Sequence, residues 1–172
     1  MLDEVIQTYM RKFQAAANER RYGDTLRIGE EMKSQFRADP PAVSEVNRYL
    51  DAMAGGYPLP GSDLVFTAVW CNPLRVFQKA LCRILESEAA KDFHEQAVEL
   101  LGEIGDSEAI PALRKALDFR WDYDEWLFVP RKSLRVLHSI GTPESLAIIK
   151  QAIASSETLI REEAISLLEK HV

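Results

Sequence analysis

Thiols are the most reactive side chains of this 172-residue sequence, which has two of them, Cys71 and Cys82. They stand eleven residues apart, so we expect them on different helices rather than as a pair of metal ligands. Cys82 follows Leu81 and precedes Ile84, a setting that favours a small buried residue over a nucleophile. The sequence also lacks a glycine-rich phosphate loop and a G-x-S-x-G elbow. These features predict a protein that is not an enzyme.

A second group of residues is suited to binding. FRWDYDEWLFVP, from Phe119 to Pro130, holds five of the fifteen aromatic residues of the chain, interleaved with acids. Aromatic anchors with an acidic rim fit a basic partner, and the candidate contact residues are Trp121, Asp122, Tyr123, Asp124, Glu125 and Trp126. In the alternative interpretation the aromatic rings tuck between helices and the acids only solvate the loop. We expect a mixture, with 126–128 directed inward and Trp121 and Tyr123 at least partly outward.

The elements that position this loop are two copies of one repeat. AVELLGEIGDSEAIPALRKAL, residues 97–117, returns as SLRVLHSIGTPESLAIIKQAI, residues 133–153, at an offset of 36 residues. Each copy reads as two helices joined by a tight turn, in which Gly105 or Gly141 takes the left-handed position. A unit of this length cannot bury its apolar face alone, so successive units must stack. The sequence therefore predicts an all-α solenoid.

Superposing the copies also aligns basic residues. A further step of 36 residues towards the N-terminus places VFQKAL in an earlier second helix. One repeat position is then occupied by Gln78, Arg114 and Lys150. The next position is occupied by Lys79, Lys115 and Gln151. Equivalent positions stack along a solenoid, which predicts a basic ridge on the second-helix face. Such a ridge could hold an acidic segment of another protein, although an ordinary solvated face has the same pattern. The candidate ridge residues are Lys79, Arg114, Lys115 and Lys150.

The remaining segments complete the expected organisation. Residues 1–54 form an N-terminal helical subdomain of three helices, the third beginning at Asp39 with Pro40 as its first helical residue. GGYPLPG, residues 55–61, is a linker. Residues 62–172 hold about three helical hairpins and a C-terminal capping helix, on which we expect Glu163 to face solvent.

One family has this pattern of residues. LLGEIGDSEAIPAL resembles the HEAT-like repeat of the phycobilisome-lyase type, with its L-G-x-I-G turn and I-P-x-L second helix. The resemblance implies an α-helical solenoid. Because the superfamily includes bilin-handling lyase subunits, a di-iron hydroxylase and many adaptor proteins, it leaves the activity open. A bilin-lyase-like, chromophore-handling protein is therefore the alternative function.

The hydroxylase relatives carry a His-Glu pair early in the first helix of several repeats. Aligned on the turn, that pair falls here on 95–96, 131–132 and 162–163, which read Glu-Gln, Arg-Lys and Glu-Glu. Arginine and lysine cannot ligate iron, so we expect no metal. The three histidines, His94, His138 and His171, are then surface or packing residues, and Arg131, Lys132 and Arg135 add positive charge to a first helix.

Composition limits the partners. A formal charge of −6 does not favour binding to nucleic acid, which requires many phosphates to be neutralised. No signal peptide or long apolar run is present, so we expect no membrane contact and a cytoplasmic location. We expect no cofactor. The sequence thus predicts a non-enzymatic scaffold, an adaptor, regulator or immunity-type inhibitor, whose partner is another protein.

Overall fold

A computed structural model describes residues 2–57, 60–121 and 124–169, and in this part of the chain it contains ten α-helices and no strand. The first helices of the repeats are α4 (Ser62–Cys71), α6 (His94–Ile104), α8 (Phe128–Ile140) and α10 (Thr158–Glu169). The second helices are α5 (Gln78–Glu86), α7 (Ile110–Ala116) and α9 (Pro143–Ala152). Short 3₁₀ segments precede three of these helices at Arg75–Phe77, Glu88–Phe93 and Ser107–Ala109. The expected all-α solenoid is confirmed.

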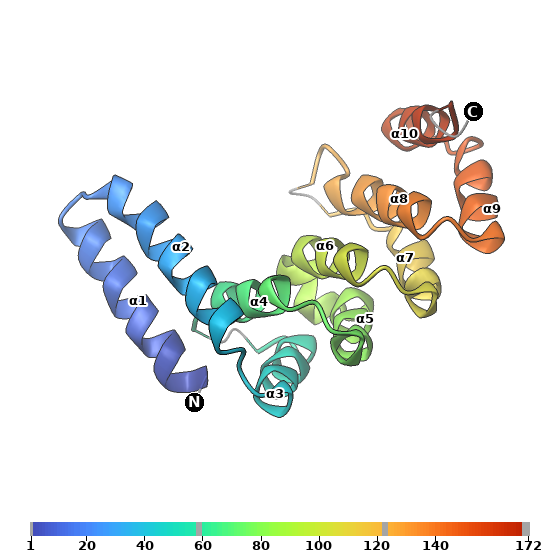
Figure 1. Ribbon diagram of the computed structural model, residues 1–172. Helices are drawn as coiled ribbons and strands as arrows, with labels where there is room; N and C mark the ends of the chain where they lie inside the picture. The colour runs from blue at the N-terminus through green and yellow to red at the C-terminus, as the bar shows by residue number, and fades with distance from the viewer. Residues whose placement is uncertain (1, 58–59, 122–123, 170–172) are drawn as a thin grey trace.

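The helices lie in two rows. Figure 1 shows α4, α6 and α8 following one another in one row and α5, α7 and α9 in the other. Helix α6 packs on α8 and α8 packs on α10, while α5 packs on α7 and each row contacts the other. The first and second helices therefore present two separate faces to solvent.

The repeated turns have the geometry that their residues predict. Gly105 and Gly141 both adopt φ of 67°, in the left-handed region that glycine enters without strain. Just beyond them, the side chains of Asp106 and Thr142 accept hydrogen bonds from the backbone N–H groups of Glu108 and Ser145. Each hairpin is thus determined by residues within its own turn.

The core continues through all the repeats. Leu101, Leu113, Leu137 and Ile149, which occupy the apolar repeat positions, are fully buried. Gly102 lies where α6 meets α8, and a Cβ atom there would stand 2.8 Å from Cγ2 of Val136. The two first helices are therefore packed closely enough to require glycine at that point.

Three helices precede the repeats: α1 (Leu2–Asn18), α2 (Tyr22–Ala38) and α3 (Val43–Ala54). Helix α1 pairs with α2, α2 packs on α4, and α3 packs on both α4 and α5. The expected start of α3 at Asp39 is wrong, because Pro40 is followed by Pro41 and a residue before proline is kept out of the helical region. The division into a subdomain (1–54), a linker and repeats stays a prediction.

Candidate functional site

The aromatic loop has a different orientation from the expected one. The side chain of Trp126 is 60% exposed and that of Phe128 is 47% exposed, whereas Leu127 is buried between them. Leu127 takes a left-handed φ of 52° at the start of α8, and from there Leu127 and Val129 face the core. The prediction that 126–128 point inward is therefore correct for Leu127 and wrong for both aromatic residues. The alternation of apolar and polar residues along the sequence does not reveal the left-handed turn at Leu127, and this turn decides which side chains face the core.

Asp124 is a structural residue. It is 7% exposed, and its carboxylate accepts hydrogen bonds from the backbone N–H groups of Phe128 at 2.8 Å and Val129 at 3.4 Å. These groups belong to the first turn of α8, where helical N–H groups lack partners within the helix. The contact of Asp124 with a partner stays a prediction, and in the free chain its carboxylate is buried and engaged by these two bonds.

The other loop residues divide between interior and surface. Trp121 is partly buried, with its ring 5.7 Å from that of His94 and 5.6 Å from that of Phe119. Glu125 is exposed like Trp126. Asp122 and Tyr123 lie outside the described residues. The acidic rim is therefore smaller than the sequence suggested, and within the described part of the loop its exposed acid is Glu125.

The four candidate ridge residues lie on successive second helices. Lys79 lies on α5, Arg114 and Lys115 on α7 and Lys150 on α9, and all four are exposed. Gln78, which occupies the position equivalent to Arg114, is 3% exposed and does not take part. Among the described residues, the basic side chains that have neither an ion pair nor a hydrogen bond are Arg20, Arg37, Lys79, Arg114, Lys115 and Lys150.

The first-helix face has the opposite character, since its cations are paired. Lys132 of α8 donates hydrogen bonds to Glu95 and Glu99 of α6. Burial alone would lower the pKa of Lys132, but these two carboxylates outweigh it and hold the pKa above its usual value. The positive charge expected on α8 is therefore neutralised by its neighbour.

The same pattern recurs between α8 and α10. Arg135 donates to Glu163 at 2.7 Å, and Arg131 does so at 3.0 Å. The bond from Arg135, then that from Arg131, keeps the pKa of Glu163 below its usual value against the effect of burial. Glu163 does not face solvent as expected, because both arginines reach it across the helix interface.

The thiols are poorly suited to nucleophilic chemistry. Burial raises the pKa of the Cys82 thiol to about 11, so the thiolate is scarce at neutral pH. Burial also raises the pKa of Cys71, whose Sγ lies 3.7 Å from the carbonyl oxygen of Lys33. Both cysteines are free. For both thiols, burial outweighs the nearby cations that would lower the pKa.

His94 is a packing residue. It is buried, its Nε2 lies 2.9 Å from the carbonyl oxygen of Ser87, and its ring stacks on Phe119 at 4.9 Å. Burial lowers its pKa, which keeps the imidazole neutral. Within the described residues, His, Cys, Asp and Glu side chains form no group of three that could hold a metal ion. The expectation of no metal stays a prediction.

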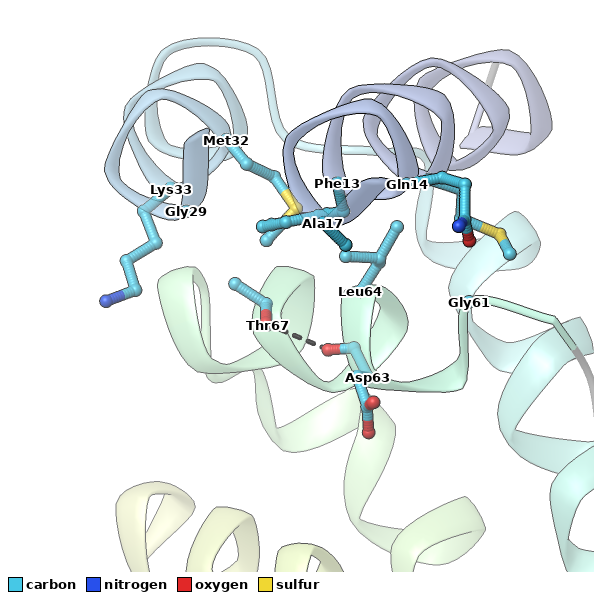
Figure 2. A pocket seen from close by; sticks show the side chains of 11 residues that line it. Phe13, Gln14, Ala17, Gly29, Met32, Lys33, Gly61, Asp63, Leu64 and Thr67 are labelled. Carbon is cyan, nitrogen blue, oxygen red and sulfur yellow. Dashed lines mark hydrogen bonds between the residues drawn. The ribbon is translucent and has the colours of Figure 1, made fainter. Parts of the chain in front are cut away.

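One hollow was not among the surfaces predicted from the sequence. It has a volume of about 610 Å³ and opens between α1, α2 and α4. In Figure 2, Phe13, Met32 and Leu64 reach into it from these three helices. A weak signal existed, because Met10 and Phe13 extend the apolar stripe of α1 beyond the width that one packing partner covers. Unlike Ile6 and Tyr9 of the same stripe, they are only partly buried.

Comparison with known proteins agrees with this architecture. The family description of HEAT repeats matches residues 79–169, which is more than half of the chain. The chain belongs to the HEAT repeat family. The finer phycobilisome-lyase type is not shown by this match. No curated protein matches the sequence.

As a HEAT repeat protein, the molecule has two faces whose charges differ in availability. The cations of α8, Arg131, Lys132 and Arg135, are paired with acids of the adjacent first helices. On the second helices, Arg83 is paired with Asp51, whereas Lys79, Arg114, Lys115 and Lys150 have no acidic partner within the described residues. None of the helices in that part of the chain combines the length and the apolar character needed to cross a bilayer.

Proposed function

We propose that this HEAT repeat protein is a non-enzymatic scaffold that binds an acidic segment of another protein along the ridge of Lys79, Arg114, Lys115 and Lys150. Its biological role would be that of an adaptor, a regulator or an immunity-type inhibitor. The stacked helices would act as a rigid support, so that binding requires little change of shape. The proposal includes a cytoplasmic location, which the two free thiols support.

The proposal rests on the observation that the charged side chains of the ridge have no partner within the described residues. In a protein of net charge −6, acids outnumber bases, and most basic side chains in the described residues have found a partner. The four ridge residues have none, although they recur on three successive second helices. A free, periodic row of cations can attract a complementary partner and set its register.

A protein segment fits this ridge better than nucleic acid does. Tight binding to a duplex depends on neutralising many phosphates, and the strongly acidic remainder of the chain would repel the backbone. An acidic peptide presents fewer charges over a shorter length. Its attraction to the ridge would act within roughly 8 Å at physiological salt.

The bilin-handling alternative receives no support from the thiols. Covalent attachment of a bilin would require a reactive cysteine, and the pKa of Cys82, at about 11, leaves little thiolate. The pKa of Cys71 is also raised by burial. We therefore propose the scaffold function alone.

Cross-linking capture from cells of the native host tests the proposal with two matched variants. Lys79→Glu with Lys115→Glu reverses two ridge charges, and Arg20→Glu with Arg37→Glu reverses two exposed, unpaired charges outside the ridge. We expect the ridge variant to lose at least about tenfold of the captured partner while the control variant retains it. The lost protein should carry an acidic segment. Equal capture by both variants would overturn the proposal.

A further inference from the structure

The hollow of Figure 2 continues into a second one on the other side of α4. The second hollow has a volume of about 360 Å³ and is lined by residues of α2, α4 and α6. Lys33, Asp63 and Thr67 line both hollows, so the two form one groove. The groove contains no ridge residue, and it follows α4 over roughly 10 Å.

Helix α4 leaves one face uncovered in this groove. Its sequence, SDLVFTAVWC, is apolar almost all round, which is typical of a helix enclosed on every side. Leu64, Val65 and Phe66 are buried as expected, yet Trp70 is 46% exposed. Asp63, Thr67 and Trp70 stand at positions i, i+4 and i+7 and therefore share the uncovered face. A face with an exposed tryptophan is typical of a binding surface.

Two acceptor groups of the residues that line the second hollow have no hydrogen-bond donor within the described residues. Asp63 has no ion pair within the described residues, and Figure 2 shows its carboxylate on the side of α4 away from α1 and α2. Gln96 lines this hollow, and its Oε1 atom is buried without a hydrogen-bond partner, which carries a free-energy cost. The other charged groups of this hollow, Lys33 and Glu99, already have ion-pair partners.

Lys33 is paired with Glu30 at 2.7 Å, and Glu99 accepts from Lys132. The accessible groups in this hollow that have no partner are therefore the carboxylate of Asp63 and the indole ring of Trp70. A guanidinium group fits both, because it donates up to five hydrogen bonds and stacks on aromatic faces.

We propose that this groove binds a segment of a second protein that carries an arginine beside a bulky apolar residue. The arginine occupies the hollow of Asp63, Gln96 and Trp70, and the apolar side chain enters the hollow of Phe13, Met32 and Leu64. The flexible side chain of Met32 adapts its shape to this apolar side chain. The proposal is independent of the ridge and makes the molecule a bridge between an acidic and a basic partner.

Gly29 is consistent with close approach of that segment. It lies inside α2 at the wall of the first hollow, and a Cβ atom there would meet no atom within 4 Å. Glycine at such a position makes a helix less stable than alanine does. Packing within the described part of the chain does not require glycine at this position.

Parallel peptide-display selections test the inference on the full chain. One selection uses the wild-type protein, and the other uses Asp63→Asn with Trp70→Ala, both at 0.15 M salt with random twelve-residue peptides. We expect peptides with an arginine next to a large apolar residue to be enriched by the wild-type protein alone. Enrichment of such peptides by both proteins, or by neither, would overturn the inference.

The enriched peptide is then synthesised with a fluorescent label, and its Kd is measured by polarisation. Trp70→Ala should weaken binding about tenfold, and Trp70→Phe by less, because the smaller ring retains part of the stacking. Replacing the peptide arginine by lysine should also weaken binding, since the planar fork is lost. Lys79→Gln with Lys115→Gln should leave the Kd unchanged. An equal Kd for arginine and lysine peptides, or sensitivity to the ridge variant, would contradict the assignment.

Discussion

At the scale of single residues, Asp124 shows how a candidate binding group can serve the fold. Its two oxygens satisfy N–H groups at the start of α8, and this arrangement turns Trp126 and Phe128 toward solvent. Glu125, the next residue, is exposed and has no such bond. Two adjacent acids in one loop therefore have different functions.

This difference predicts the effect of two matched substitutions. Asp124→Ala should lower the free energy of unfolding by about 1 to 2 kcal/mol, as the loss of a helix cap does. Glu125→Ala should change it by less than about 0.5 kcal/mol, which is usual for surface positions. Urea denaturation followed by circular dichroism measures both. Equal effects would show that Asp124 does not cap α8.

At the scale of elements, ion pairs between first helices join α6 to α8 and α8 to α10. Glu163 of α10 receives Arg131 and Arg135 of α8, as Glu95 and Glu99 of α6 receive Lys132. Four of these residues, Glu95, Arg131, Lys132 and Glu163, lie at the positions where the hydroxylase relatives carry their His-Glu pairs. In this chain they hold charges of opposite sign that link successive helices.

Glu163 provides a pH test of this linkage. Because its folded pKa lies below the usual value of 4.5, it stabilises the fold above that pH, and the contribution is lost as pH falls through the folded pKa. Glu163→Gln should therefore be less stable than wild type at pH 7, and the difference should shrink below pH 4.5. The exposed neighbour Glu162, changed to Gln, is the control. A gap between Glu163→Gln and wild type that stays constant from pH 7 to pH 3 would contradict the ion pair.

The elements also show what the sequence could predict. The turns at Gly105 and Gly141 were predictable because the residues that determine them are adjacent along the chain. The pairing of Glu163 was not, since it depends on how α10 is aligned against α8. The groove could not be predicted from the sequence either. It is formed jointly by α1, α2, α4 and α6, and none of these helices forms it alone.

At the scale of the whole molecule, the two rows of helices separate two kinds of surface. The second helices carry free cations that recur with the repeat, and this surface could be predicted because periodicity in sequence becomes alignment in a solenoid. The N-terminal helices and α4 form a groove whose free polar groups are acceptors. The proposed functions of both surfaces follow from which charges remain unpaired after folding.

The central claim is that the ridge is the surface that a protein partner covers. Lysine footprinting tests it most directly: the chain is acetylated briefly, alone and in its cross-linkable complex from the native host, and each lysine is quantified by mass spectrometry. The account predicts that acetylation of Lys79, Lys115 and Lys150 falls several-fold in the complex, while that of Lys12 on α1 is unchanged. Ridge lysines that remain as reactive in the complex as in the free protein would contradict it.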